Sequence, residues 1–422
     1  MEIVKTFGHC VEALCEKNPA CARALLCTGW RAQNLKFRCL PDRRLTKADQ
    51  YLARIMMDLM LAPLQRPEQC AMVSIFTPCE LVQEAGLSPY NVEAFSCYLA
   101  ATYAEQNGLR TVEDCGLPET LCSYHRTFLG AAETGLLPKP RCIVYTSLAC
   151  DANLVTFRHL ADLYRVPSFS IDVPYTPNDA NVTYVAGQLR ELAVFLRAQT
   201  GTAIDEDRLR ARVQRGRRTL ENYDRYQTLR ADRYVPSDLV SPMYCAMTNS
   251  VLLGTEQEDR YVSMLLDGIE QAPPARGTRI YWMHTIPFWS DAVKEVLMLR
   301  EEAQIVGCEL AQMADVSRTS DDPYEAMAQR LVYSAMNGGI SRRIAQGIRN
   351  AKQAGADGVV WFNHWGCKHT LGGSALAKKQ FEAAGLPFLI LDGDGCDRSH
   401  GGEGQTATRL GAFLELLEEH HA

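Results

Sequence analysis

The residues of this chain best suited to chemistry are its cysteines, and one of them lies in the segment FNHWGCKHTLGG, residues 362–373. In this segment Cys367 stands between His364 and His369, shortly after an apolar run. A cysteine in such a setting serves as a metal ligand, as a nucleophile or as a small buried side chain. The other cysteines, and the elements around them, help to decide among these roles.

The number and spacing of the cysteines limit the choice. The chain holds 16 cysteines in 422 residues, and its first residues lack the basic leader, apolar core and cleavage site of a signal peptide. We therefore expect a cytoplasmic protein, in which disulfides are rare and thiols pack, bind metals or do redox chemistry. No two cysteines are spaced as C-x-x-C, which argues against thioredoxin-like, zinc-ribbon and ferredoxin motifs. Any metal ligands come from distant parts of the chain.

Several cysteines share one kind of position, directly after an expected β-strand. They are Cys79, Cys150, Cys367 and Cys396. Ligands of open parallel sheets bind at the carboxyl ends of the strands. A helix that starts after Cys150 would lower the pKa of its thiol, and Gly366 lets the backbone approach a bulky group. The shared position favours a metal cluster held by thiolates.

The remaining cysteines receive different interpretations. Cys122, in ETLCSYHRTFLG, has serine, histidine and arginine neighbours that could donate hydrogen bonds to cluster sulfurs. Helical patterns around Cys10, Cys15, Cys21, Cys27 and Cys97 predict packing roles. Zinc is the weaker choice of metal because no compact group of ligands exists, although His364 and His369 remain zinc-ligand alternatives. A Cys–His nucleophile also stays open, but no histidine is marked as its base.

Apolar runs that alternate with helical patterns position these cysteines. The expected strands are AMVSIF (71–76), CIVYTS (142–147), SFSIDV (168–173), RIYWMH (279–284), GVVWFN (358–363) and PFLILD (387–392). This alternation predicts an α/β fold with two parallel-sheet domains, flavodoxin-like or Rossmann-like. The expected division is a helical N-terminal segment (1–70), a first α/β domain (71–185), a helical connector (186–272) and a second α/β domain (273–422).

Composition excludes several classes of protein. Net charge is −6, and the basic residues form no stripe, so we expect no nucleic acid partner. No apolar run reaches membrane-spanning length, so we expect no membrane segment. The phosphate-binding motif G-x-x-x-x-G-K-[ST] is also absent, which gives no support for ATP binding of that type.

Several motifs in a fixed order carry a resemblance to a known family. They are FTPCELVQEAGLSP, ETLCSYHRTFLG, YTSLACDAN followed by VPSFSIDVP, and the closing block from HWGCKHTLGG to GAFLELL. From about Ser74 to its end, the chain resembles the 2-hydroxyacyl-CoA dehydratases, benzoyl-CoA reductases and double-cubane cluster proteins. The sequences of the segments HWGCKHTLGG and LDGDGCD are most similar to those of the double-cubane group.

The resemblance implies an iron–sulfur enzyme with its cluster between two α/β domains. It implies low-potential electrons from a separate ATP-hydrolysing iron–sulfur activator protein, which would explain the missing ATP motif. It also implies a homodimer, or a heterodimer with a related subunit, acting on a small molecule or an acyl-CoA. Dehydratases of this family form a ketyl radical from a 2-hydroxyacyl-CoA and then expel hydroxide, benzoyl-CoA reductases reduce an aromatic ring, and double-cubane proteins reduce small molecules.

The resemblance carries the family's cluster ligands to Cys122, Cys150 and Cys367. A single [4Fe-4S] cubane would use these three, whereas the favoured [8Fe-9S] double cubane would add Cys79, Cys245 and Cys396. The proton-handling groups are unknown, with His125, His364 and Ser147 as weak candidates near the ligands in sequence. The alternatives from other classes are a non-catalytic electron-transfer protein and a zinc- or thiol-bearing binding module.

Overall fold

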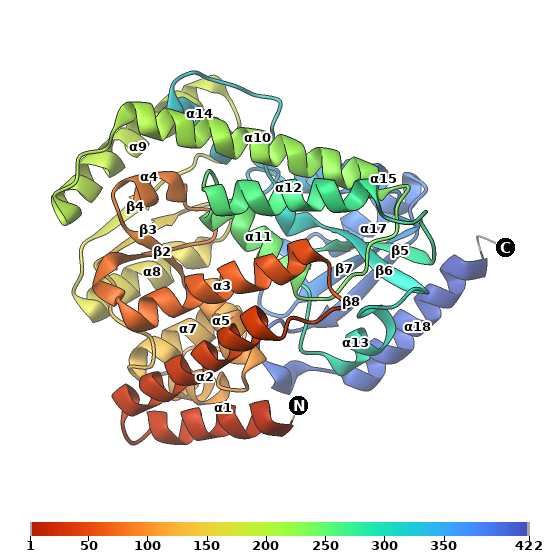
Figure 1. Cartoon of the computed structure of the whole chain (residues 1–422), viewed down its shortest axis with the longest axis horizontal. Helices are drawn as coiled ribbons and strands as arrows, with labels where there is room; N and C mark the ends of the chain where they lie inside the picture. The colour runs from red at the N-terminus through yellow and green to blue at the C-terminus, as the bar shows by residue number, and fades with distance from the viewer. Residues whose placement is uncertain (1, 420–422) are drawn as a thin grey trace.

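Two parallel sheets organise the chain, which we describe over residues 2–419 of a computed structural model (Figure 1). The first sheet has the strand order β2-β1-β3-β4. Its strands are β1 (Cys70–Val73), β2 (Ser88–Asn91), β3 (Cys142–Thr146) and β4 (Ser168–Ile171). The second sheet repeats this arrangement as β6-β5-β7-β8. Its strands are β5 (Thr278–Met283), β6 (Ala303–Cys308), β7 (Gly358–His364) and β8 (Phe388–Gly393).

Three helices precede the first sheet. They are α1 (Glu2–Cys15), α2 (Pro19–Cys39) and α3 (Lys47–Gln65), and they lie side by side in the red and orange part of Figure 1. Asn18 caps α2 by accepting a hydrogen bond from the backbone N–H of Cys21, and Thr46 caps α3 in the same way from Asp49. The helix α3 packs on β2, so this segment covers part of the first sheet.

Helices alternate with the strands of the first sheet. They are α4 (Cys79–Glu84), α5 (Val92–Ala101), α6 (Gln106–Asp114), α7 (Ser123–Glu133) and α8 (Asp151–Tyr164). The helix α8 packs on β3, and α7 packs on α5, α6 and α8. The carboxyl ends of β1 and β3 therefore lead into loops that start the helices α4 and α8, and Cys79 and Cys150 lie at these helix starts.

A helical stretch separates the two sheets in sequence. It comprises α9 (Asp179–Thr200), α10 (Glu206–Arg230), α11 (Ser241–Val251) and α12 (Glu256–Glu270). Figure 1 shows α10 and α12 side by side, and α12 also packs on α3. Asp205 caps α10 by accepting from the backbone N–H groups of Asp207 and Arg208. The four-part division of the chain itself stays a prediction.

The second sheet is covered by the last helices. They are α13 (Asp291–Leu297), α14 (Pro323–Val332), α15 (Ile340–Gln353), α16 (Lys368–Leu371), α17 (Ser374–Ala383) and α18 (Glu403–Glu419). Both α17 and α18 pack on β8, and α18 also contacts α13. The buried core follows the period of the strands, because Val359 and Trp361 of β7 join one apolar cluster while Val360 and Phe362 join the other. Burial of both faces explains the continuous apolar run in this strand.

The predicted α/β class with parallel sheets is confirmed. Every expected strand is present, within a few residues of its expected ends. Two strands were missed, β2 and β6. The segment of β2 holds Pro89 and Asn91, which are turn formers, and its burial against β1 overrides this local preference. Within residues 2–419, no helix is both long and apolar enough to cross a membrane.

Candidate functional site

Three of the predicted ligands occupy the same local position. Cys122, Cys150 and Cys367 are the N-cap residues of α7, α8 and α16. Backbone N–H groups at helix starts favour negative charge, and those of Ala152 and Asn153 act to lower the pKa of the Cys150 thiol. The chain thus presents three thiols, each at a site that suits an anion.

The fold brings these three thiols together. Burial raises the pKa of Cys122 well above its usual value, and the nearby charges of Cys367 and Cys150 raise it further. Burial raises the pKa of Cys150 to about 11, despite its N–H neighbours, and Cys367 also contributes to this rise. Mutual repulsion of this kind disfavours ionisation of neighbouring thiols, and a positively charged group bound between them would favour the thiolates.

A close backbone contact joins the loop after β7 to the start of α7. Gly366 has φ +82°, and a Cβ placed on it would lie 2.8 Å from the backbone N of Cys122. Only glycine permits this approach without displacement. The contact explains how Cys122 and Cys367, far apart in sequence, come to share one site.

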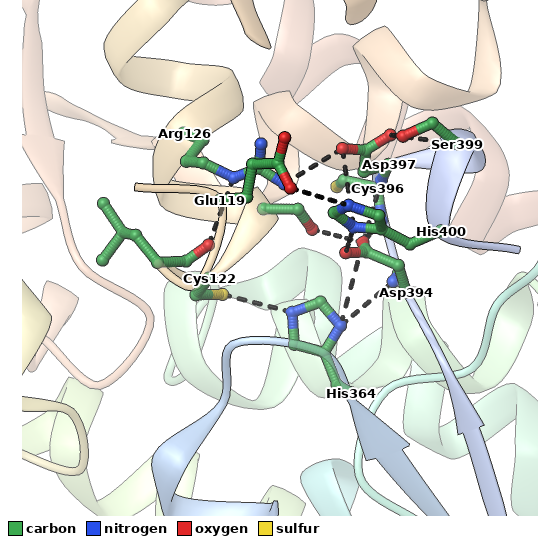
Figure 2. Close-up of polar contacts among 12 residues, drawn as sticks. Glu119, Cys122, Arg126, His364, Asp394, Cys396, Asp397, Ser399 and His400 are labelled. Carbon is green, nitrogen blue, oxygen red and sulfur yellow. Dashed lines mark hydrogen bonds and ion pairs between the residues drawn. The ribbon is translucent and has the colours of Figure 1, made fainter. Parts of the chain in front are cut away.

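His364 connects Cys122 to the loop after β8. Its Nε2 lies 3.2 Å from Cys122 Sγ, and its Nδ1 accepts a hydrogen bond of 3.0 Å from the backbone N–H of Gly395 (Figure 2). Burial lowers the pKa of His364, so the ring is neutral. A neutral ring that accepts at Nδ1 carries its proton on Nε2 and donates it to the sulfur.

Cys367 has its own polar neighbours. Its Sγ lies 3.3 Å from Thr370 Oγ1 and 3.5 Å from His284 Nε2. Burial and the positive charge of Arg343 hold the pKa of His284 well below its usual range. His284 follows β5 directly, at the same edge of the second sheet as His364. The sulfur of Cys367 therefore contacts a hydroxyl group and an imidazole ring, each of which can donate a hydrogen bond to it.

A buried ion pair supports the Cys367 loop. The guanidinium of Arg343 donates to both carboxylate oxygens of Glu309, at 2.6 and 2.7 Å. It also donates to the backbone carbonyl of His369 and to Thr370 Oγ1, at 3.1 and 3.2 Å. Removing one partner of such a buried pair costs more free energy of unfolding than the intact pair contributes. Arg343 thereby holds the first turn after Cys367 in place.

Asp394 organises the opposite side of the site. It accepts hydrogen bonds from Ser123 Oγ and from the backbone N–H groups of Cys396 and Asp397, the latter two at 2.9 and 2.8 Å (Figure 2). Arg126 is fully buried beneath this loop and bonds Asp397 Oδ2 at 3.0 Å. These contacts fix the loop after β8 against the start of α7.

The three additional candidate ligands, Cys79, Cys245 and Cys396, differ in how near they lie to the three N-cap cysteines. Cys396 lies in a small buried cluster with Tyr124, against which Cys97 and Cys122 pack. Cys79 is buried at the first turn of α4, among Glu80, Glu93 and Arg330. Cys245 is buried on α11, where its neighbours are Tyr223, Tyr261 and Cys308. Only Cys396 therefore adjoins the group of three, through Cys122.

The proposed proton-handling residues have structural partners. Burial lowers the pKa of His125 to about 3, and its Nδ1 lies 2.9 Å from Thr156 Oγ1. Ser147 Oγ accepts a hydrogen bond from the backbone N–H of Val173 at 2.8 Å. Of the three weak candidates, only His364 touches a predicted ligand.

The chemistry of the donor set is compatible with an iron–sulfur cluster. Among the described residues, no group of three His, Cys, Asp or Glu side chains is arranged to hold a single metal ion. Three thiols at helix starts, two of them beside an imidazole Nε2, are the ligand and hydrogen-bond types that such clusters use.

Two pockets are neighbours, with Leu220 and Arg330 in the lining of both. The larger pocket, of about 320 Å³, is lined by Arg217, Arg218 and Arg318, and also by carboxylates such as Asp315. The smaller pocket, of about 60 Å³, is lined by residues that include Leu148, Thr77 and Met313. Leu148 lies two residues before Cys150. The larger pocket is thus charged, and the smaller one, which includes Leu148, is more apolar.

Several residues of the site were missed in the sequence. His284, Arg343, Asp394 and Glu309 had not been singled out. His284 and Asp394 follow strands directly, so the strand-end rule that identified the cysteines applies to them too. Glu309 also follows a strand directly, but that strand, β6, was itself missed. Arg343 carries no local signal, because its pairing with Glu309 depends on how α15 packs.

The fold and the grouped thiols define an α/β protein with a cysteine-lined centre at the carboxyl ends of its strands. The model of the family described as 2-hydroxyglutaryl-CoA dehydratase, D-component, matches residues 74–417. The chain therefore belongs to this family, and it belongs with enzymes. The family predicted from the motifs is confirmed.

Three characterised relatives cover much of the chain. Lactoyl-CoA dehydratase subunit alpha of Anaerotignum propionicum is 22% identical over 387 residues, 82% of this chain and 90% of the relative. The (R)-phenyllactyl-CoA dehydratase beta subunit of Clostridium sporogenes is 21% identical, over 81% and 90%. The (R)-2-hydroxyglutaryl-CoA dehydratase subunit alpha of Acidaminococcus fermentans is 24% identical, over 67% and 61%. All three are subunits of dehydratases.

Proposed function

We propose that this chain is an iron–sulfur component of a 2-hydroxyacyl-CoA dehydratase, with a [4Fe-4S] cluster held by Cys122, Cys150 and Cys367. The observation that carries the proposal is the close approach of the Cys367 loop to Cys122 at Gly366, with Cys150 electrostatically coupled to both thiols. Three protein thiolates leave one iron of a cubane for an outside ligand or substrate. When bound, the cluster supplies single electrons at low potential.

The residues around the thiols prepare the site for this group. Gly366 keeps the loop after β7 tight against Cys122, and Arg343 holds the turn after Cys367. His364 and Thr370 direct polar hydrogens at two of the sulfurs. These contacts orient the cysteine side chains that would hold the cluster, and burial of the site limits the access of water.

The proposed substrate is a 2-hydroxyacyl-CoA, which loses water to give a 2-enoyl-CoA. The relatives are dehydratases of lactoyl-, phenyllactyl- and 2-hydroxyglutaryl-CoA. The larger pocket has Arg217, Arg218 and Arg318 in its lining as candidate partners of CoA phosphates, with Arg217 also paired to Glu221 and Arg318 to Asp179. The smaller pocket, which includes Leu148, is the candidate position of the thioester arm.

The proposed partners are a second, related subunit and an ATP-hydrolysing iron–sulfur activator protein, all acting in the cytoplasm. The relatives are named as alpha or beta subunits, which supports a heterodimer over a homodimer. The sequence has no G-x-x-x-x-G-K-[ST] motif of its own, which fits an activator that hydrolyses ATP on a separate chain.

A double cubane that reduces a small molecule is the second candidate. One observation favours it, because Cys396 and Cys97 lie beside Cys122 and could extend the ligand set on that side. It is the second choice because Cys79 and Cys245 are each buried among other neighbours. The number of irons per chain separates the two candidates.

The test is turnover by protein purified and reconstituted without oxygen. With partner subunit, activator, ATP and a 2-hydroxyacyl-CoA, we expect 2-enoyl-CoA by mass spectrometry. Omitting ATP or the activator should abolish the product. A cluster-loaded complex that forms no enoyl-CoA but consumes reductant with a small molecule would favour the double-cubane candidate instead.

A further inference from the structure

Two imidazole rings stack beside the thiols. His284 follows β5 and His364 ends β7, and these strands are neighbours in the second sheet. The ring centroids are 5.7 Å apart with an interplanar angle of 20°. Each ring turns its Nε2 to a different ligand, His364 to Cys122 Sγ at 3.2 Å and His284 to Cys367 Sγ at 3.5 Å. The pair therefore addresses two of the three proposed ligands at once.

The partners of Nδ1 fix the tautomer of His364 and allow the same tautomer in His284. His364 Nδ1 accepts from the backbone N–H of Gly395, so its proton must lie on Nε2. His284 Nδ1 lies 3.1 Å from Thr285 Oγ1, a hydroxyl that can donate to it or accept from it. When Thr285 donates, both Nε2–H groups point at sulfur as donors, which is the polarity that a thiolate requires.

The backbone of His284 is held in a costly conformation to achieve this. Its φ is +76°, in the left-handed region that side chains other than glycine rarely adopt. Its backbone N–H donates to Glu309 Oε2 at 3.0 Å, and Glu309 is itself fixed by Arg343. Strain of this kind persists only where the surroundings enforce it, and it gathers at functional sites.

We propose that His284 and His364 are paired positioning residues whose Nε2–H groups bond the thiolates of Cys367 and Cys122 and raise the reduction potential of the cluster. This inference rests on the proposed function. Hydrogen bonds to cluster sulfurs stabilise the reduced state most, because it carries the greater negative charge. Removing either donor should make the cluster harder to reduce.

The test compares His284→Leu and His364→Leu with His284→Gln and His364→Gln in anaerobically reconstituted protein. Leucine removes the donor, whereas the glutamine amide can place an N–H near the position of Nε2. Midpoint potentials come from redox titrations followed by EPR, with iron and sulfide measured on the same samples. His159→Leu is the matched control, since this exposed histidine of α8 bonds Glu133 and no proposed ligand.

We expect each leucine variant to shift the equilibrium constant for reduction at least tenfold against reduction, about 59 mV for one electron. The double leucine variant should shift further, the glutamine variants less, and His159→Leu not at all. Leucine variants with full iron and the wild-type potential would overturn the inference. So would glutamine variants that shift as far as leucine.

If a leucine variant loses its iron, the matching glutamine variant shows whether the hydrogen-bond donor or the folding of the site is the cause. If a leucine variant fails to hold iron, the inference requires the matching glutamine variant to keep its cluster with a smaller shift. A glutamine variant that also loses iron means a role in folding alone and overturns the inference. A wild-type chain without a cluster would contradict the proposed function itself, which keeps the two failures distinct.

Discussion

The thiols at three helix starts differ from the other cysteines in what they can bind. We predict that replacing Cys122, Cys150 or Cys367 by serine abolishes the iron–sulfur signal, because each supplies one of three ligands and serine is a poor ligand for iron–sulfur clusters. Iron and labile sulfide analysis with EPR measures this. Cys39→Ser, at an exposed position on α2, is the control and should keep the wild-type iron content.

A retained cluster in any of the three serine variants would remove that residue from the ligand set. Such a result for Cys150 would be the most damaging, since its electrostatic effect on Cys122 and that of Cys367 on it are what place Cys150 near the other two thiols.

Gly366 offers a second test at the level of one residue. Alanine there combines a strained φ of +82° with a Cβ 2.8 Å from Cys122 N. We predict destabilisation beyond the roughly 1–2 kcal/mol of left-handed strain alone, together with loss of iron. Gly385→Ala is the matched control, because its φ is +81° but a Cβ would meet nothing within 4 Å.

Denaturant unfolding and iron analysis measure both variants. The Gly385 variant should lose about 1–2 kcal/mol and keep its iron, since only the strain applies there. Equal behaviour of the two variants would mean that the contact between Gly366 and Cys122 does not shape the site.

At the scale of elements, Arg343 of α15 joins the segment after β6 to the turn after Cys367. We predict that Arg343→Met costs about 3–5 kcal/mol of unfolding free energy, because it leaves Glu309 buried without its partner. Chemical denaturation measures this. Lys378→Met, which breaks an exposed pair with Glu382 on α17, is the control and should cost about 0.5 kcal/mol or less.

A loss for Arg343→Met as small as that for the lysine control would contradict the role given to this pair. The iron content of Arg343→Met should also fall, because His369 and Thr370 lose their donor and the loop that carries Cys367 loosens.

The elements themselves were largely open to prediction. Apolar runs such as 358–363 identified strands because both faces of a parallel sheet are buried. No strand was predicted for the segment Ser88–Asn91, because its proline and asparagine indicate a turn and only pairing with β1 makes it a strand. Ala303–Cys308 was also missed, although it is buried throughout.

The site was predictable only in part, for a physical reason. Cysteines after strands could be found because parallel strands end at one edge of a sheet. Which of them meet depends on how the two halves of the chain pack, and the contact of Gly366 with Cys122 shows no local trace of this. The same holds for Arg343 and Glu309, whose partners lie far apart in sequence.

At the scale of the whole molecule, buried acids make stability depend on pH. Burial raises the pKa of Glu93 from 4.5 to about 7. The folded state thus holds the proton of Glu93 more tightly than the unfolded state does. The contribution of Glu93 to the free energy of unfolding is therefore full below pH 4.5 and is lost as pH rises through 7. The loss is on the order of 3 kcal/mol.

Glu93→Gln removes this dependence and keeps an acceptor for the backbone N–H of Ile75. We predict that the variant gains stability relative to wild type between pH 5 and pH 8, measured by urea unfolding of the apoprotein. Glu415→Gln, on the exposed face of α18, is the control and should show no such trend. A Glu93→Gln difference that stays constant with pH would refute the prediction.

The number of irons per chain shows whether three cysteines hold one cubane. We would measure iron and acid-labile sulfide, with an EPR spectrum of the reduced state, on protein purified without oxygen. We expect about four of each per chain, held by Cys122, Cys150 and Cys367 and unchanged in Cys79→Ser and Cys245→Ser. About eight irons, with loss in those two variants, or no iron after reconstitution, would contradict a single cubane on these three cysteines.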